Sequence, residues 1–272
     1  MSSVDIFRWR EWTSPVPAVT REVLTSQPVE DAEAGRPPLL FVPGYAHGAW
    51  AFAENWLEHA AERGFPAYAM SLRGHGTSGS APKTTLRAYT HDVVQVAARL
   101  PRQCVLIGHG VGGLAVAQAL ARYPARAGVL VAPVVGGLRM VGAAFVHNPF
   151  GTLPALVGAP VRLGRRQLFG RELSVGRARD YLSRLAEPDA PRVMFQLVRR
   201  HRPPRPVGNA PVLVVGSPDD KVVPRASLEW VARHYGGAPL LFPGMGHDLM
   251  LDARWQEPLD AILDWLEKLP RP

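Results

Sequence analysis

The chain contains a single cysteine, so no disulfide can form within it. Cys104 lies in an apolar stretch, where we expect a small core residue and not a reactive thiol. No apolar run reaches the roughly 18–20 residues that a membrane-spanning helix needs, because Arg139 interrupts the longest candidate. The first residues carry too many charges for a secretory signal. These absences predict a globular protein without a transmembrane segment, located in the cytosol.

Lysine is also scarce, since only three of the 31 basic side chains are Lys. Residues 134–207 contain thirteen Arg and four acidic side chains, a net charge of +9. Because the whole chain has a net charge of +8, the remaining residues together carry −1. This asymmetry is typical of solvated helix faces, or of a surface that steers anionic substrates, carrier proteins or membranes. No nucleic-acid-binding motif accompanies it, so we expect no nucleic-acid partner.

Apolar runs alternate with amphipathic helical patterns in the order that builds a parallel sheet from βαβ units. A length of 272 residues with 47% hydrophobic residues suits one large core with an insertion. We therefore predict an α/β fold with a mostly parallel sheet flanked by helices. The expected strands are 37–42, 65–71, 105–107, 128–131, 211–215 and 239–242, and the expected helices are 50–63, 86–100, 114–123 and 254–269.

Residues 134–207 interrupt this alternation. They contain no convincing strand, and their apolar stripes predict helices near 153–163, 178–185 and 191–200. The Pro-rich stretch 203–206 indicates the end of the segment. We therefore predict a core of residues 1–133 and 208–272, with a helical cap formed by residues 134–207.

The most specific motif is the strand-to-helix turn Gly108-His-Gly-Val-Gly112. It matches the nucleophile elbow G-x-S-x-G, whose sharp turn presents a serine Oγ above a parallel sheet, except that Gly110 stands in place of the serine. Through this motif the chain resembles the α/β-hydrolase superfamily. The resemblance implies an α/β-hydrolase fold with a helical cap inserted after strand 6 of that fold. It also implies that Gly110 occupies the nucleophile position without supplying a nucleophile.

The family's catalytic acid and histidine follow the nucleophile in that order along the chain. The resemblance places the acid in the turn 216–224, which contains two aspartates. The family's pattern of Asp, three residues and Pro selects Asp220 over Asp219. The loop that follows the last strand supplies His247. A carboxylate that fixes one histidine tautomer leaves the other ring nitrogen free to act as a general base.

An oxyanion hole is implied as well, formed by the backbone N–H groups of Val111 and Tyr45. Such groups stabilise developing negative charge whatever side chain stands beside them. We expect structural roles for His47 and His109. No His, Asp or Glu grouping in the sequence has the spacing of metal ligands, and no cofactor is expected.

The segment from Arg166 to Leu185 looks like the caps of lysophospholipase-like and monoacyl-ester hydrolases. This likeness predicts an apolar acyl, ester or polyketide-like small-molecule substrate, with or without an anionic group for the cap arginines. The sequence does not decide whether the chain forms a homodimer. The candidate substrate-binding residues are Phe145, Phe150, Leu156, Met194 and Phe195.

Glycine adopts the strained backbone conformation of an elbow without cost, so Gly110 preserves the turn while removing the nucleophile. Three explanations stay open at this point. Gly110 is a knock-out or a natural variant of a serine ester hydrolase. Alternatively, His247 and Asp220 act directly on water or substrate, in hydrolase, lyase or cyclase chemistry. In the third explanation the chain binds a ligand without turning it over.

Overall fold

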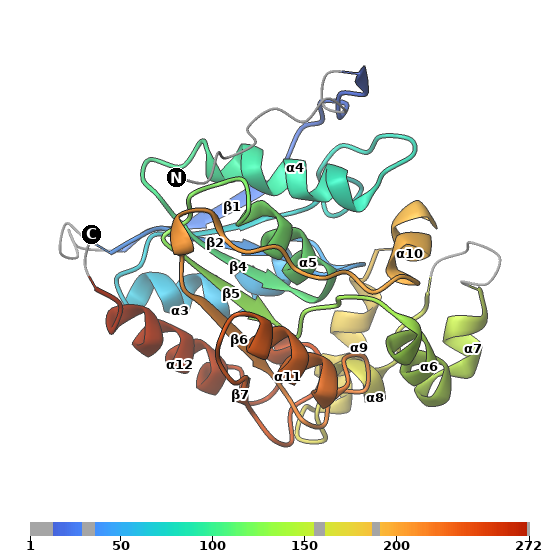
Figure 1. Cartoon of the computed structure of the whole chain (residues 1–272). Helices are drawn as coiled ribbons and strands as arrows, with labels where there is room; N and C mark the ends of the chain where they lie inside the picture. Colours follow the sequence, from blue (N-terminus) through green and yellow to red (C-terminus); the bar gives the residue numbers. More distant parts are fainter. Residues whose placement is uncertain (1–12, 29–35, 155–160, 187–190, 271–272) are drawn as a thin grey trace.

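The computed structural model describes residues 13–28, 36–154, 161–186 and 191–270. Within these residues seven strands form one sheet in the order β1-β3-β2-β4-β5-β6-β7 (Figure 1). β1 pairs antiparallel with β3, and the other neighbours are parallel. The sheet and its flanking helices confirm the predicted α/β class. The strands are β1 (Val23–Ser26), β2 (Leu39–Val42), β3 (Ala67–Met70), β4 (Val105–His109), β5 (Ala127–Val131), β6 (Val212–Gly216) and β7 (Leu240–Leu241).

Two layers of helices cover the sheet. α4 (Leu86–Ala97) and α5 (Gly110–Ala119) lie together on one face, whereas α3 (Trp56–Glu62) and α12 (Gln256–Glu267) lie on the other (Figure 1). Because both faces are covered, β2, β4 and β5 are buried along their whole length. Apart from His109 at the end of β4, their residues are apolar or glycine, which suits burial on both faces.

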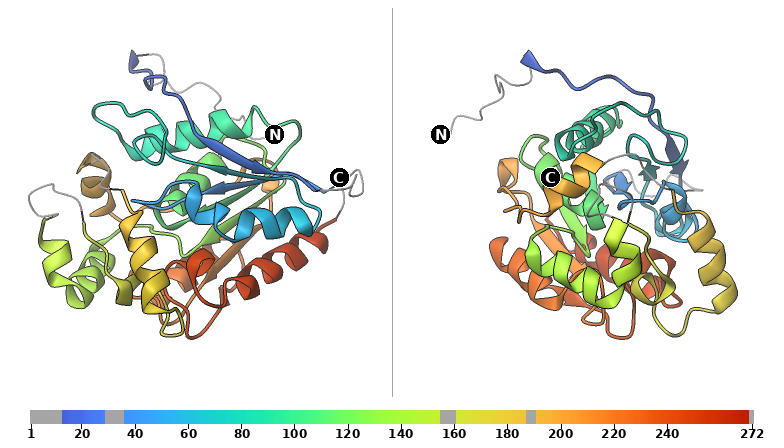
Figure 2. Two further views of the ribbon diagram at one scale, coloured as in Figure 1. Left: turned by 180° about the vertical axis from the view of Figure 1, so that it is seen from behind. Right: turned by 90° about the vertical axis from the view of Figure 1, so that its right-hand side faces the viewer.

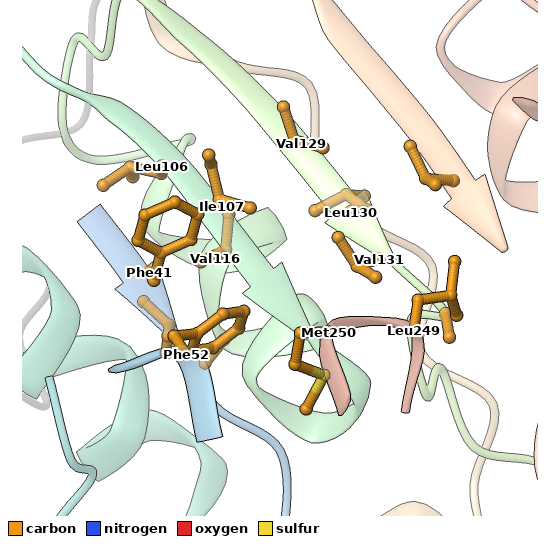
Figure 3. Close-up of a cluster of buried hydrophobic side chains, with 14 of the residues drawn as sticks. Phe41, Phe52, Leu106, Ile107, Val116, Val129, Leu130, Val131, Leu249 and Met250 are labelled. Atoms are coloured by element: carbon orange, nitrogen blue, oxygen red, sulfur yellow. The ribbon is translucent and has the colours of Figure 1, made fainter. Parts of the chain in front are cut away.

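The hydrophobic core is continuous across the central strands, as Figure 3 shows. Phe41 of β2 stacks on Phe52, with ring centroids 5.0 Å apart, and Ile107 and Leu130 come from the neighbouring strands β4 and β5. Met250, which follows the last strand, belongs to the same cluster. The core thereby holds the loops that follow β2, β4 and β7 in fixed positions.

In the described part of the chain between β5 and β6, five α-helices, here called the insert helices, gather at one end of the sheet (Figures 1 and 2). They follow the fifth described strand of this chain. α9 and α10 overlap the helices expected near 178–185 and 191–200. The helix expected over 153–163 is wrong at its C-terminal end, because residues 161–163 are not helical. Residues 155–160 lie outside the described residues. The insert helices are α6 (Leu138–His147), α7 (Pro149–Thr152), α8 (Arg165–Leu168), α9 (Val175–Ser183) and α10 (Pro191–Leu197).

Some elements differ from their sequence-based predictions. The stretch 50–63 forms two helices, α2 (Trp50–Ala53) and α3, and α5 begins at Gly110 instead of Leu114. β1, α6, α8 and α11 (Arg225–His234) had no predicted counterpart. Among the described residues, none of the helices combines the length and apolarity that crossing a bilayer requires.

Candidate active site

The turn between β4 and α5 brings residue 110 into contact with the loop of His247. Gly110 has φ +55°, in the left-handed region that glycine adopts without strain. A Cβ built on Gly110 would lie 3.4 Å from His247 Nε2, 3.5 Å from Gly44 Cα and 4.0 Å from Val134 Cγ2. We call this space the notch. A side chain at position 110 would therefore point directly at the imidazole.

The tightness of the same turn explains its other glycines. A Cβ on Gly112 would lie 2.2 Å from the carbonyl oxygen of Pro43, and one on Gly108 would lie 2.5 Å from that of Gly112. A side chain at Gly112 would push α5 away from the loop after β2, and one at Gly108 would push α5 away from β4. Gly108 and Gly112 are therefore required by backbone packing, whereas Gly110 has room for a side chain.

His247 is buried and paired with Asp220. Its Nδ1 lies 2.8 Å from Asp220 Oδ2, and Asp220 Oδ1 accepts the N–H groups of Val222 and Val223 at 2.7 and 2.9 Å. Burial lowers the pKa of His247, but the charge and hydrogen bond of Asp220 outweigh it, so that the pKa is raised above its ordinary value. With Nδ1 held by the carboxylate, Nε2 faces the notch.

Asp219 makes a different contact. Its Oδ2 accepts the N–H of Gly244 at 2.7 Å, which ties the turn after β6 to the loop that precedes His247. Ser217 adds a second tie, because its hydroxyl donates to the carbonyl of Met245 at 2.7 Å. Asp219 thus fixes the loop, and Asp220 is the carboxylate that contacts the imidazole.

Tyr45 and Val111, the predicted oxyanion-hole residues, line one cavity together with Gly110 and His247. Val111 lies in the first turn of α5, where backbone N–H groups have no carbonyl partner within the helix. The loop that carries Tyr45 includes Ala46 at φ +70°, a conformation that costs a residue with a Cβ about 1–3 kcal/mol. Such strain persists only where surrounding contacts hold the loop in place.

The cavity has a volume of about 290 Å³ and its walls are mostly apolar. Three of the candidate substrate-binding residues, Phe145, Met194 and Phe195, line it. Phe150 does not line it, because its side chain points outward from α7 and is 90% exposed. Leu156 lies outside the described residues. Further lining residues, which the sequence analysis did not single out, are Met140, Val141, Ala144, Leu163, Leu197 and Val198.

Beside His247 lies a second buried cluster that sequence spacing did not predict, and its residues His47 and His109 also line the cavity. His47 Nε2 lies 2.9 Å from Asp248 Oδ2, and His47 Nδ1 lies 3.0 Å from the carbonyl oxygen of Tyr45. Burial alone would raise the pKa of Asp248, but His47 outweighs it and the pKa is lowered. The buried pair joins the loop after β2 to the loop after β7.

His109 completes this cluster. Its Nε2 lies 3.2 Å from the carbonyl oxygen of His247 and 3.5 Å from Asp248 Oδ1. Burial lowers its pKa to about 3, so its ring is neutral. Ligand atoms of His47, His109 and Asp248 lie within 4.8 Å of one another, a grouping that could geometrically hold a metal ion. Since His47 and Asp248 already form a hydrogen bond with each other, we assign the cluster a structural role.

Comparisons with known proteins agree with this architecture. A profile described as the Alpha/beta hydrolase family matches residues 39–264. The chain is similar in structure to a monoacylglycerol lipase of Paleococcus ferrophilus, with a TM-score of 0.66 and 20% identity over 92% of this chain and 98% of that chain. It is also similar to an esterase from Exiguobacterium antarcticum, with a TM-score of 0.70 and 15% identity over 92% of this chain and 96% of that chain. At these identities the likeness concerns the fold alone.

A relative of higher identity aligns over a shorter stretch. A candidate non-heme haloperoxidase of Mycobacterium phage D29 is 33% identical over 96 residues, which cover 35% of this chain and 34% of that protein. The match therefore spans about a third of that relative's length.

Proposed function

Because the chain belongs to the alpha/beta hydrolase family, we propose that it acts on an apolar acyl or ester-like small molecule, with His247 and Asp220 as its general base. The observation that carries this proposal is the 3.4 Å between His247 Nε2 and the Cβ position of residue 110. A base paired with a buried carboxylate at 2.8 Å is directed at the end of an apolar cavity. A purely structural histidine has no need of that orientation.

The notch offers a route that needs no serine. In this mechanism a water molecule beside His247 Nε2 gives a proton to the imidazole while its oxygen attacks the acyl carbon. The N–H groups of Val111 and Tyr45 stabilise the resulting oxyanion, and the imidazolium returns the proton to the leaving oxygen as the C–O bond breaks. A positioned base contributes about 10²–10⁴-fold to the rate, and an oxyanion-hole donor about 10²–10³-fold.

Two alternatives concern the same site. The first is a serine ester hydrolase that has lost its nucleophile, as the room at position 110 allows. The second is a ligand-binding protein without turnover, which the apolar cavity and the missing hydroxyl favour. Removing the serine of a serine hydrolase lowers kcat by about six orders of magnitude. The first alternative therefore predicts a large gain of activity when Gly110 is replaced by Ser, and the second predicts none.

Gly110→Ser tests the proposal. We expect its kcat/KM on nitrophenyl esters of two to eight acyl carbons to exceed that of the unaltered chain by about 10³-fold or more, because a hydroxyl beside His247 Nε2 provides a nucleophile. Gly176→Ser is a matched control, since Gly176 lies on α9 with nothing within 4 Å of its Cβ position. The proposal fails if the folded Gly110→Ser variant is as inactive as this control.

His247→Ala in the unaltered chain separates direct base catalysis from ligand binding. In the proposed mechanism the slow hydrolysis by the unaltered chain falls to the level of the buffer, because the substitution removes the ring nitrogen that lies 3.4 Å from the Cβ position of residue 110. A ligand-binding protein would show no product before or after the substitution, and it would retain its affinity for an acyl compound.

A further inference from the structure

We propose that a groove between the insert helices and the turn after β6 binds a phosphate dianion, free or as the phosphate group of a small molecule. The groove has a volume of about 410 Å³ and is separate from the apolar cavity. Four of its six lining residues are cationic, and none is acidic. The lining residues are Arg165, Arg166, Phe169, Gly170, Arg171 and Lys221.

The four cations have no acidic partner among the described residues. The nearby carboxylates are engaged elsewhere: Glu172 pairs with Arg254 at 3.6 Å, and Asp219 accepts the N–H of Gly244 at 2.7 Å. Asp252, which lies under the groove, is buried and accepts the N–H groups of Gly170 and Gly246 at 2.8 and 2.7 Å. Converging positive charges repel one another, and a bound anion would relieve that repulsion.

Arg165 is the residue best prepared for a ligand. One of its terminal nitrogens donates to the carbonyl of Leu173 at 2.8 Å, which fixes the guanidinium at the start of α8. Its Nε is buried and has no hydrogen-bond partner in the described part of the chain. A buried donor without an acceptor costs about 1–3 kcal/mol, and a ligand oxygen that reached this nitrogen would remove that cost.

The chemistry of the lining favours phosphate over a carboxylate. Arginine donates two parallel hydrogen bonds to phosphate oxygens, and lysine adds a point charge. Three guanidinium groups and one ammonium can together contact several oxygens of a dianion. A carboxylate carries one charge and two oxygens, and would leave most of these donors without a partner.

The groove adjoins the candidate active site through two chain segments. Lys221 follows Asp220 directly, and the next residue, Val222, lines the apolar cavity. Leu163 also lines that cavity, two residues before Arg165. The proposal nevertheless does not depend on catalysis, because it is tested by binding alone.

Calorimetric titration with inorganic phosphate at pH 8 and constant ionic strength tests the proposal. We expect saturable binding with one site per chain, and weakening by about tenfold or more in Arg165→Gln/Lys221→Gln, which removes two charge-assisted contacts. The matched control is Arg177→Gln/Arg179→Gln, which removes the same charge from exposed positions on α9. The control should bind phosphate within about twofold of the unaltered chain, by the same conversion.

Arg171→Gln provides a second variant, because Arg171 is exposed and its loss should not affect folding. It should also weaken binding. If phosphate binding weakens equally in the groove variants and the control variant, phosphate is attracted only by the overall positive charge of the protein, and the proposal is overturned. An absence of saturable binding would overturn it as well.

Titration with glycerol 3-phosphate distinguishes free phosphate from a phosphate ester as the ligand. Tighter binding than that of inorganic phosphate indicates an esterified ligand, and weaker binding indicates free phosphate.

Discussion

Residue 110 combines a left-handed backbone with free space for a side chain. Its φ of +55° is unstrained for glycine, whereas a residue with a Cβ there costs about 1–3 kcal/mol. We predict that Gly110→Ala lowers the free energy of unfolding by about that amount, measured by urea denaturation. Gly176→Ala on α9 should raise it by up to about 1 kcal/mol, because alanine favours a helix. Equal stability of Gly110→Ala and the unaltered chain would contradict the described turn.

The charge state of His247 sets the pH dependence of any base-catalysed reaction. Its pKa is raised above the ordinary value of 6.5, and only the neutral ring accepts a proton. Activity of Gly110→Ser should therefore fall as the pH drops through a midpoint above 6.5. Asp220→Asn removes the charge that raises this pKa, so the midpoint should move to lower pH. The measurement is kcat/KM for an acetyl ester between about pH 5 and 9, and an unchanged midpoint in Asp220→Asn would contradict the pairing.

At the scale of elements, the His47–Asp248 pair joins the loop after β2 to the loop after β7. Both side chains are fully buried, and removing one partner of such a pair costs about 3–5 kcal/mol. Asp248→Asn should lower the free energy of unfolding by about 3–5 kcal/mol at neutral pH. Asp180→Asn, at a position whose side chain is 66% exposed, should leave the free energy of unfolding nearly unchanged.

The pH dependence of this effect follows from the lowered pKa of Asp248. A carboxyl group with a lowered folded-state pKa stabilises the protein above its unfolded pKa of about 3.9, and this stabilisation is lost as the pH falls. The difference in unfolding free energy between Asp248→Asn and the unaltered chain should therefore narrow below about pH 4. A difference that is constant with pH would show that the carboxylate is not paired.

The insert helices are expected to set the length of acyl chain that the cavity accepts. Ala144 of α6 lines the cavity, whereas its neighbour Ala143 does not. In a Gly110→Ser background, Ala144→Phe should lower the preference for octanoyl over acetyl esters by about tenfold, because the new ring occupies space for the chain. Ala143→Phe is the matched control, and an equal loss of preference in both variants would argue against α6 as a wall.

The sequence predicted the central elements more accurately than the insert helices. β2 and β5 carry uninterrupted runs of apolar residues and glycine, and β4 does so up to its last residue, His109. β1 has only four residues and no fully buried position, so it lacks such a pattern. The sequence predicts a start of α5 at Leu114, four residues late, because glycine is a poor helix former. The first turn of α5 nevertheless contains Gly112, because close packing against the carbonyl oxygen of Pro43 leaves no room for a side chain.

The sequence predicted those residues of the candidate site that belong to a short local motif. The turn of Gly110 and the loops of Asp220 and His247 each have a short pattern, and the structure brings all three together. The cluster of His47, His109 and Asp248 was not predicted, because its members come from three distant segments. His47 and Asp248 are 201 residues apart in the chain. The prediction that Phe150 binds substrate is wrong, because the sequence pattern of the four-residue helix α7 does not show which of its side chains face the cavity.

At the scale of the whole molecule, the parallel sheet explains the position of the site. Tyr45 follows β2, residue 110 follows β4, Asp220 follows β6 and His247 follows β7. In such sheets, the loops at the carboxyl ends of the strands gather at one edge. The insert helices lie at that same end in two views (Figure 2). The fold therefore brings the base His247, the backbone amides of Tyr45 and Val111, and the apolar walls of the cavity together, although they are far apart along the chain.

Covalent labelling of Gly110→Ser with an alkyl fluorophosphonate, followed by mass spectrometry, tests the direction of His247 most directly. The reagent phosphonylates a serine whose hydroxyl is activated by a neighbouring base, so we predict one adduct per chain, mapped to position 110, formed at least about 10³-fold faster than in Gly110→Ser/His247→Ala. Labelling no faster than in the Gly176→Ser control, or labelling unaffected by the loss of His247, would contradict the account.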